Sequence, residues 1–300
     1  MRSFILLALA GLGAQLVDGS LGMAYGVSST TLLLFVGVAP ALASAAVHIA
    51  EVGTTAVSGI SHASFGNVDW SKIVWMAVPG GIGAFLGAYL LVYASTAEAT
   101  AGLVEPLVAI FLFCLGVYVL ARFAFRRNER PVEVRPISRK FLTPLGLVAG
   151  FLDAMGGGGW GPISTPTLLS SGRMEPRKII GTVDTSEFVV ALCASLGFLL
   201  SLSFAQIPWT VVGALLLGGV VAAPLAAFIV RLLPARVLGT AVGGVILLVN
   251  MKTFFEAIGV TGAAASAGYF LIVAVWLAAM AFAIAAIRRD RVLGAESQPA

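Results

Sequence analysis

The sequence predicts an all-α polytopic membrane protein, because the chain is strongly apolar, poorly charged and rich in glycine. Of its 300 residues, 59% are hydrophobic and 11% are charged, and the mean hydropathy is +1.01. A soluble domain carries about 25% charged residues, so this chain cannot cover a water-facing surface, and its apolarity also excludes disorder. Apolar stretches of about 20 residues or more indicate membrane-spanning helices rather than barrel strands. The 35 glycines favour helices whose backbones approach closely.

Composition also excludes several partners and cofactors. The net charge of +4 is too small and too local to indicate a nucleic-acid partner. Cys114 and Cys193, the two cysteines, lie in apolar runs without metal-ligand spacing, and we interpret them as small buried hydrophobes. The chain has no nucleotide-binding loop of the Walker type. We therefore expect a lipid bilayer as the surroundings and neither a cofactor nor a metal; the oligomeric state stays open.

Nine apolar blocks follow one another along the chain. The first half contains four of them, the second half contains four, and one more follows, in this order: 3–38, 40–64, 71–93 and 99–125; 141–169, 177–203, 208–230 and 236–256; and 263–287. This order predicts a first transmembrane repeat over 1–125, a basic linker over 126–140, a second repeat over 141–256, and an extra helix with a tail over 257–300.

The two halves share an internal duplication. When residues 11–34 are aligned with 146–169, an offset of 135 positions, ten of 24 positions are identical, and they include Asp18 with Asp153. An offset of 136 pairs other polar positions: His48 falls on Asp184 and Glu51 on Glu187. The first 14 residues by themselves resemble a signal peptide, but the duplication predicts that they belong to the mature fold.

The first block of each half is interrupted by glycines. Apolar residues 4–17 meet Asp18 to Gly22, and residues 141–152 meet Asp153 to Gly159. Four consecutive glycines cannot hold a helix, since each costs about 1 kcal/mol relative to alanine. We therefore expect two short helices joined by a glycine break in each block, with the second helices resuming from Val27 and after Pro162. Non-helical backbone at membrane depth survives only where it lines a cavity or is buried in protein.

Lys and Arg residues predict which loops face the cytoplasm. The linker region from Arg122 to Lys140 carries seven of them, segment 170–178 carries three, and the tail 288–291 carries three more. All of these lie on one side only if block 141–169 enters and leaves at the cytoplasmic face as a re-entrant hairpin. The C-terminus is then cytoplasmic, and we expect the protein to lie in the inner membrane of a bacterium.

The same argument applied to the first half makes the two repeats inverted. Block 40–64 then runs outside to inside, while its equivalent 177–203 runs inside to outside. Each repeat contains a broken re-entrant hairpin plus three transmembrane helices, an architecture typical of many secondary transporters. The alternative is eight or nine full crossings, which places several Arg-rich loops outside.

The starts of the second half-helices are candidates for an anion site. Half-helix N-termini present free N–H groups and the positive end of the helix dipole, and glycines before them leave the backbone accessible. Neighbouring hydroxyl groups add donors. The candidate substrate-binding residues are Gly22, Gly26, Ser28, Ser29, Thr30, Gly156, Gly157, Gly158, Gly159, Ser164 and Thr165. The alternative interpretation is helix-capping hydroxyls beside packing glycines.

A second group of candidates is ionisable. Ser44, His48, Glu51, Thr55, Ser58 and His62 recur at helical spacing on one face of block 40–64. Ionisable residues inside a membrane segment are costly, and they usually face a cavity or each other. The candidates for proton coupling are Asp18, His48, Glu51, Asp153, Asp184 and Glu187. Two alternatives stay open: interhelical hydrogen bonding for the stripe, and capping of the broken backbone for the two aspartates.

The segment from Gly150 to Leu168, which reads GFLDAMGGGGWGPISTPTL, resembles the glycine-rich signature of the sulfite exporter TauE/SafE family. The resemblance covers the chain from about residue 3 to residue 287. It implies a polytopic permease with duplicated halves that moves small sulfur-containing anions, including sulfite and sulfonates. The matching positions are Gly156 to Gly159, Pro162 and Pro166, whereas the first half lacks the glycine run and the two prolines.

We therefore expect a non-enzymatic secondary transporter that exports a small anion, most simply sulfite or another sulfur oxyanion or sulfonate, with proton coupling. An anion channel is one alternative, because it shares the helix-dipole site and needs no coupling carboxylates. A membrane-embedded enzyme or assembly protein is the alternative from another class, although the chain contains neither HExxH nor GxSxG.

Overall fold

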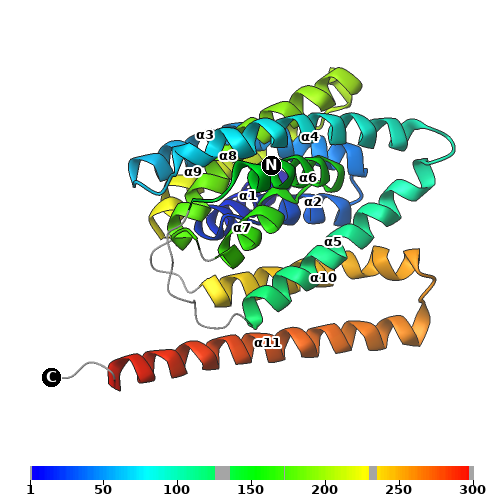
Figure 1. The fold of residues 1–300 in the computed structure, drawn as a ribbon. Helices are drawn as coiled ribbons and strands as arrows, with labels where there is room; N and C mark the ends of the chain where they lie inside the picture. The colour runs from blue at the N-terminus through cyan, green and yellow to red at the C-terminus, as the bar shows by residue number, and fades with distance from the viewer. Residues whose placement is uncertain (1, 126–135, 172, 230–234, 297–300) are drawn as a thin grey trace.

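The computed structural model describes residues 2–125, 136–171, 173–229 and 235–296, and these residues are almost entirely helical (Figure 1). No strand occurs among them. The helices are α1 (Arg2–Leu21), α2 (Tyr25–Phe35), α3 (Pro40–Ser64), α4 (Trp70–Thr96), α5 (Ala101–Ala124), α6 (Arg139–Gly156), α7 (Trp160–Ser171), α8 (Pro176–Ser201), α9 (Trp209–Ile229), α10 (Ala235–Ala257) and α11 (Gly262–Glu296), with a short 3₁₀ turn η1 (Phe204–Gln206). The prediction of an all-helical fold is confirmed.

The first block of each half is broken where the sequence predicts it. α1 and α2 are separated by residues 22–24, and α6 and α7 by residues 157–159. Gly22 and Gly157 open the two breaks with nearly equal backbone angles, φ 67° and 69°. The second helices begin earlier than expected, at Tyr25 and Trp160. Pro162 fits within the first turn of α7, because the N–H groups there lack an intrahelical acceptor.

Corresponding helices of the two halves make corresponding contacts. α1 packs along α9, and α6 packs along α4. A Cβ atom on Gly11 of α1 would lie 2.6 Å from the carbonyl oxygen of Leu215, and one on Gly146 of α6 would lie 2.4 Å from that of Met76. The absence of a side chain at these glycines lets the backbones touch. α3 and α8 pack against each other between these pairs, and α5 packs along α10.

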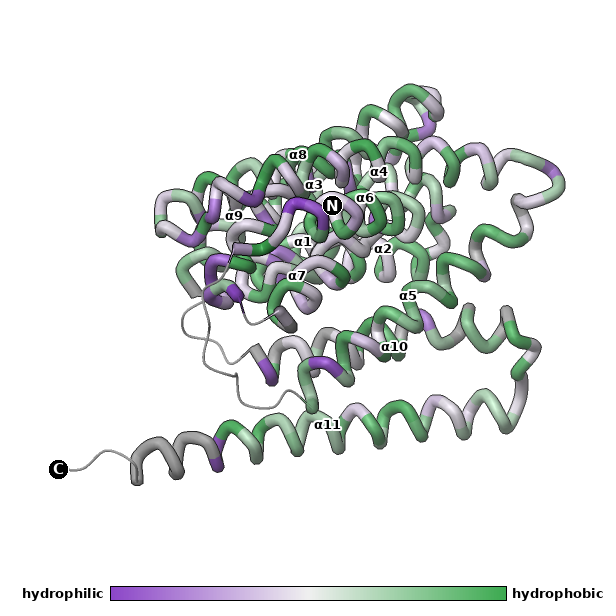
Figure 2. Tube along the Cα trace, viewed as in Figure 1, coloured by the Kyte–Doolittle hydropathy of each residue, from purple (hydrophilic) through white to green (hydrophobic). Residues whose placement is uncertain are grey.

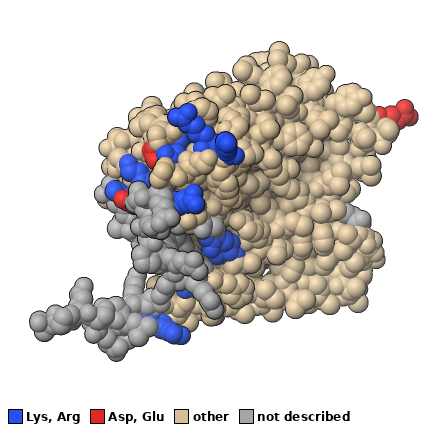
Figure 3. Space-filling model, in the orientation of Figure 1, with Lys and Arg blue, Asp and Glu red and all other residues tan. Residues whose placement is uncertain are grey.

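Several contacts show which helix ends lie together. The Lys178 Nζ donates to the carbonyl oxygen of Val68 (3.1 Å), and the Asp69 N–H donates to Thr182 Oγ1 (2.8 Å), which joins the α3–α4 loop to the start of α8. The Arg139 guanidinium lies 4.4 Å from the ring centroid of Trp75, which joins the start of α6 to α4. α6 therefore starts at the end of the bundle to which α7 returns. The Lys and Arg side chains visible in Figure 3 gather at one end of the molecule.

Within the described residues, seven helices are long and apolar enough to cross a membrane: α1, α3, α4, α5, α8, α9 and α11. Figure 2 shows the hydrophobic residues that run along these helices, and large apolar side chains such as Phe270 and Ile60 are exposed on the outside. This set differs from the predicted crossings at two helices. α1 meets the criteria over Phe4–Leu21, whereas the apolar part described in α10, Gly239–Leu248, is short.

Candidate functional site

The two chain breaks meet in the interior of the bundle. A Cβ atom on Gly26, the second residue of α2, would lie 3.0 Å from the Cα atom of Gly158 and 3.1 Å from Glu51 Oε1. A Cβ atom on Gly158 would lie 2.2 Å from the backbone nitrogen of Val27. The start of α2 thus packs directly on the break of the other half, beside a buried carboxyl group.

A pair of reciprocal hydrogen bonds joins each half-helix to the opposite break. The Thr30 hydroxyl of α2 donates to the carbonyl oxygen of Gly157, and the Thr165 hydroxyl of α7 donates to that of Gly22 at 2.6 Å. Thr30 is equivalent to Thr165, and Gly22 to Gly157, at the offset of 135 positions. These hydroxyls therefore satisfy backbone carbonyls that the broken helices leave without an intrahelical donor.

The two aspartates before the breaks cap the half-helices that follow. Asp18 Oδ1 accepts the Tyr25 N–H at 3.2 Å. Asp153 Oδ1 accepts the N–H groups of Gly159 and Trp160 at 2.7 and 3.0 Å. The capping interpretation of these aspartates is thus seen in the structure, and the first N–H of each half-helix is already occupied. One oxygen of each aspartate stays available for other contacts.

The other oxygen of Asp153 contacts the polar stripe of α3. His48 Nε2 lies 3.0 Å from Asp153 Oδ2 and 4.0 Å from Glu51 Oε2. His48 Nδ1 lies 2.8 Å from the carbonyl oxygen of Ser44, so this nitrogen carries a hydrogen and donates it. The hydrogen bond between Nε2 and the Asp153 carboxyl then requires a second proton, held by one partner or the other. The His48–Asp153 pair therefore shares a proton inside the bundle.

All six residues of the predicted stripe on α3 are buried, as their spacing predicts. Ser44 donates to the carbonyl oxygen of Ala154 at 2.8 Å. Neither carboxyl oxygen of Glu51 has a hydrogen-bond partner, although the residue is only 1% exposed. A buried carboxylate without a donor is costly unless a proton or a cation neutralises it. Glu51 therefore needs such a partner.

The symmetry-related cluster, built from Asp18 of the first half and from Asp184 and Glu187 of the second, is made of acids. One carboxyl oxygen from each of Asp18, Asp184 and Glu187 lies within 4.8 Å of the other two, and all three residues are buried. The base nearest to this cluster in the described part of the chain is His62, whose Nε2 lies 3.7 Å from Asp184 Oδ2. The structure thus brings the six ionisable candidates into two clusters: one includes the imidazole of His48, and the other consists of three acids with His62 at its edge.

The predicted hydroxyl and glycine candidates do not all meet at the crossing. Ser29 and Ser164, which are equivalent in the two halves, are buried, and neither hydroxyl has a hydrogen-bond partner. Gly159 packs on the backbone of Asp153, whereas a Cβ atom on Gly156 would meet the ring of Phe111 on α5. Gly156 therefore serves helix packing.

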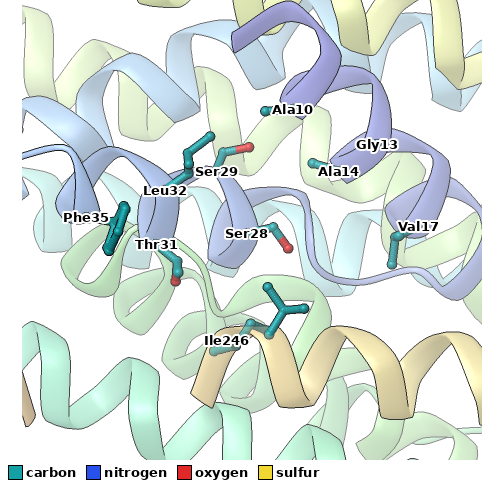
Figure 4. Close-up of a pocket in the computed structure, with 11 residues that line it drawn as sticks. Ala10, Gly13, Ala14, Val17, Ser28, Ser29, Thr31, Leu32, Phe35 and Ile246 are labelled. Atoms are coloured by element: carbon teal, nitrogen blue, oxygen red, sulfur yellow. The ribbon is translucent and has the colours of Figure 1, made fainter. Parts of the chain in front are cut away.

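Ser28 and Ser29 line a pocket of about 350 Å³ between α1, α2 and α10 (Figure 4). The rest of its lining is mostly apolar and includes Val17, Leu32 and Ile246. The structure therefore places Ser28 on an apolar face of α2.

Sequence reasoning missed two buried polar residues near these elements. Asn250 of α10 donates to Thr31 Oγ1 at 2.9 Å and ties α10 to α2. Gln15 of α1 is fully buried, and neither its amide nitrogen nor its amide oxygen has a partner. The signal for Gln15 was its position one turn before Asp18, on the same face of α1.

Comparison with known proteins agrees with this architecture. A family model described as sulfite exporter TauE/SafE matches residues 7–253. The probable membrane transporter protein YtnM of Bacillus subtilis (strain 168) is 47% identical over 288 residues, which cover 96% of this chain and 94% of that protein. No solved structure matches the chain. With its seven helices of membrane-spanning length, the chain belongs to the TauE/SafE sulfite exporter family of integral membrane transporters.

Proposed function

We propose that the protein is a secondary transporter that moves a small sulfur-containing anion, such as sulfite or an organosulfonate, out of the cell across the bacterial inner membrane, with proton coupling. The observation that carries the proposal is the crossing of two broken helices at a buried polar centre. The family supports the sulfur anion as substrate.

The two halves, 1–125 and 141–256, act in this proposal as inverted repeats, joined by the cytoplasmic linker 126–140, with 257–300 as an added helix and cytoplasmic tail. The directions of the packed helices support the inversion. α6 runs parallel to α4, and both start at the end of the bundle where the Lys and Arg residues gather. α1 runs parallel to α9, and α9 starts at the opposite end of the bundle. α1–α2 and α6–α7 are then re-entrant hairpins that enter from opposite sides. Transporters with this symmetry bind substrate near the midplane, between broken helices.

Hydroxyl and backbone donors bind the anion in this proposal. Ser29 and Ser164 supply buried hydroxyl groups without a partner, and the first turns of α2 and α7 supply the positive ends of their dipoles. Gly22, Gly26 and Gly157 to Gly159 let the backbones of the two breaks approach each other. No described Lys or Arg forms an ion pair in this centre. Neutral donors bind an anion reversibly, because no fixed charge has to be left unpaired when the anion departs.

Protons move in this proposal through the His48–Asp153 pair and Glu51. The pair already shares a proton at 3.0 Å, and Glu51 lies one helical turn from His48 with no other partner. An anion arriving beside Gly26 lies next to Glu51, so binding favours the protonated carboxyl group. Proton uptake and anion binding are then linked, because each relieves the charge repulsion that opposes the other.

The test is anion counterflow in proteoliposomes at two pH values. Vesicles loaded with unlabelled sulfite are diluted into labelled sulfite, and sulfate, thiosulfate and a short sulfonate are tried as competitors. Accelerated exchange of a sulfur anion, absent from protein-free vesicles, supports a carrier. A current carried by the anion without counterflow contradicts a carrier and identifies a channel. No flux of any sulfur anion contradicts the proposed substrate class.

A further inference from the structure

Three carboxyl groups lie together in the bundle without a compensating charge. Asp18 comes from α1, Asp184 and Glu187 come from α8, and their nearest oxygens lie within 4.8 Å of one another. Their exposed fractions are 1%, 0% and 5%, so solvent does not screen their repulsion. Among the residues that the structure describes, no Lys or Arg pairs with any of them.

The oxygen atoms of this acid cluster are mostly without donors. Asp18 Oδ1 accepts the Tyr25 N–H, but Asp18 Oδ2 and both carboxyl oxygens of Asp184 have no hydrogen-bond partner. His62 Nε2 is 3.7 Å from Asp184 Oδ2, beyond hydrogen-bond reach, and even a charged imidazole would balance only one of three carboxylates. Such buried oxygens without a donor are costly as carboxylates unless a cation or protons neutralise them.

The equivalent place in the other half shows what kind of ligand is needed. At the offset of 136 positions, Asp184 corresponds to His48 and Glu187 to Glu51. The imidazole of His48 lies between Asp153 and Glu51, at 3.0 and 4.0 Å. One half therefore holds a side chain that can be positive between two carboxyl groups. The acid cluster has a third carboxyl group at that position, so a cation or protons from solution have to neutralise it.

Two further oxygen-bearing side chains lie next to the turn of α1 that carries Asp18. Ser58 Oγ and Gln15 Nε2 each lie 3.6 Å from the Cβ position of Gly19, the residue after Asp18. Both side chains are fully buried, and neither has a hydrogen-bond partner. A hydroxyl and an amide oxygen are ligands that hard cations accept alongside carboxylates.

We propose that Asp18, Asp184 and Glu187 bind a hard, oxygen-coordinated cation, Na⁺ or Ca²⁺, with Ser58 and Gln15 as neutral ligands. Cations of this size sit about 2.3–2.6 Å from their oxygens, which the spacing within 4.8 Å allows. The site stands on the acid cluster alone and does not depend on the proposed anion.

Direct binding to the purified protein in nanodiscs tests the site. The protein is kept in N-methylglucamine chloride without any sulfur anion, and Na⁺, Ca²⁺, Mg²⁺ or choline chloride is titrated while Tm and isotope binding (²²Na⁺ or ⁴⁵Ca²⁺) are followed. A saturable rise in Tm and stoichiometric binding with Na⁺ or Ca²⁺, but not with choline, are expected. The more effective ion identifies the ligand. If neither ion binds, the cation site is wrong, and protons neutralise the acid cluster. That result would leave the proposal of anion transport unaffected.

Two substitutions at Asp184 locate the site. Asp184→His copies the His48 arrangement, so this variant should remain folded and lose cation binding by about tenfold or more. Asp184→Asn should weaken binding similarly, which guards against a folding defect in the first variant. Glu98→Gln, an exposed acid outside the cluster, is the control and should bind as the wild type does. Undiminished binding in folded Asp184→His and Asp184→Asn would overturn the assignment.

Discussion

Thr165 Oγ1 lies 2.6 Å from the carbonyl oxygen of Gly22, so a residue of one chain half completes the broken backbone of the other. Thr30 makes the equivalent bond to Gly157 in the reverse direction. Because the two bonds span 143 and 127 residues of sequence, they hold the breaks together only after both halves have folded. They tie the two broken helices, α1–α2 and α6–α7, into one unit.

Removing either hydroxyl should weaken this unit. Thr165→Val or Thr30→Val leaves a buried carbonyl without its donor, at a cost of about 1–3 kcal/mol. We expect a lower Tm for each variant in detergent. The control is Thr167→Val on the same helix, whose hydroxyl bonds to Ile163 within α7 and joins nothing across the halves. A double variant whose loss equals that of either single variant would show that the two bonds act together, whereas silent single variants would contradict the role assigned here.

Gly158 should tolerate no side chain. Its φ of 153° disfavours other residues, and a Cβ atom there would lie 2.2 Å from the Val27 nitrogen. Gly158→Val should abolish anion flux while the protein still inserts, and Gly158→Ala should reduce flux in the same direction. Gly213→Ala in α9, where a Cβ atom meets nothing within 4 Å, is the control. Normal transport by Gly158→Val would mean that the breaks need not touch.

The two unpartnered serine hydroxyls should contribute to anion affinity. Ser29→Ala and Ser164→Ala each remove one hydrogen-bond donor, worth about 1 kcal/mol or about fivefold in Kd. Ser28→Ala, on the apolar flank of α2, should change affinity little. Affinity is read from the concentration dependence of counterflow. A large effect at Ser28 and none at Ser164 would move the site into the pocket of Figure 4, which Ser28 and Ser29 both line.

Topology gives a prediction that does not depend on substrate. With Cys114 and Cys193 replaced by serine, single cysteines at Ser138 and Arg173 should react with an impermeant maleimide from the same, cytoplasmic side. Both positions are exposed, and they lie next to the starts of α6 and α8. A cysteine at Glu98, in the α4–α5 loop, should react from the opposite side. Labelling of position 173 from the periplasm would rule out the α6–α7 hairpin and the inversion with it.

Glu51 should couple anion flux to proton flux. Glu51→Gln keeps the shape of the side chain beside Gly26 but cannot exchange a proton, so net anion flux should lose its dependence on a pH gradient. Anion-for-anion exchange should survive, because it requires no net proton movement. Glu187→Gln is measured in parallel as the equivalent change in the second half. Both fluxes are recorded on the same vesicles, and wild-type anion flux without proton movement would exclude coupling.

Local pattern was sufficient to predict the broken helices and the buried face of α3. The segments that begin at Asp18 and Asp153 interrupt the helical periodicity, and the polar residues from Ser44 to His62 recur at helical spacing. Both features therefore depend only on residues that are close in sequence. The duplication added pairs that no local pattern contains, such as His48 with Asp184. It could do so because equivalent residues occupy equivalent places in the fold.

Contacts between distant helices could not be predicted in this way. Gly156 belongs to the same glycine run as Gly158, yet it packs on Phe111, because the turn of the backbone at Gly157 sends neighbouring residues in different directions. Asn250 gave no signal in an apolar block, although it binds Thr31 of α2. The starts of α2 and α7 were missed by two and three residues, because helix caps depend on Asp18 and Asp153, which lie a turn or more away.

Asp184 places a carboxyl group where the symmetry-related residue, His48, has an imidazole. This difference also bears on the direction of the proposed transport. Two halves of the same design, facing opposite ways, would by themselves give a carrier that works equally well from either compartment. His48 beside Asp153 and Asp184 beside Asp18 remove that equivalence, since an anion leaving past one cluster meets a different charge from an anion leaving past the other. The duplicated scaffold is therefore electrically asymmetric at these two clusters. In the proposed carrier, we expect the rate of anion release to differ between the two compartments.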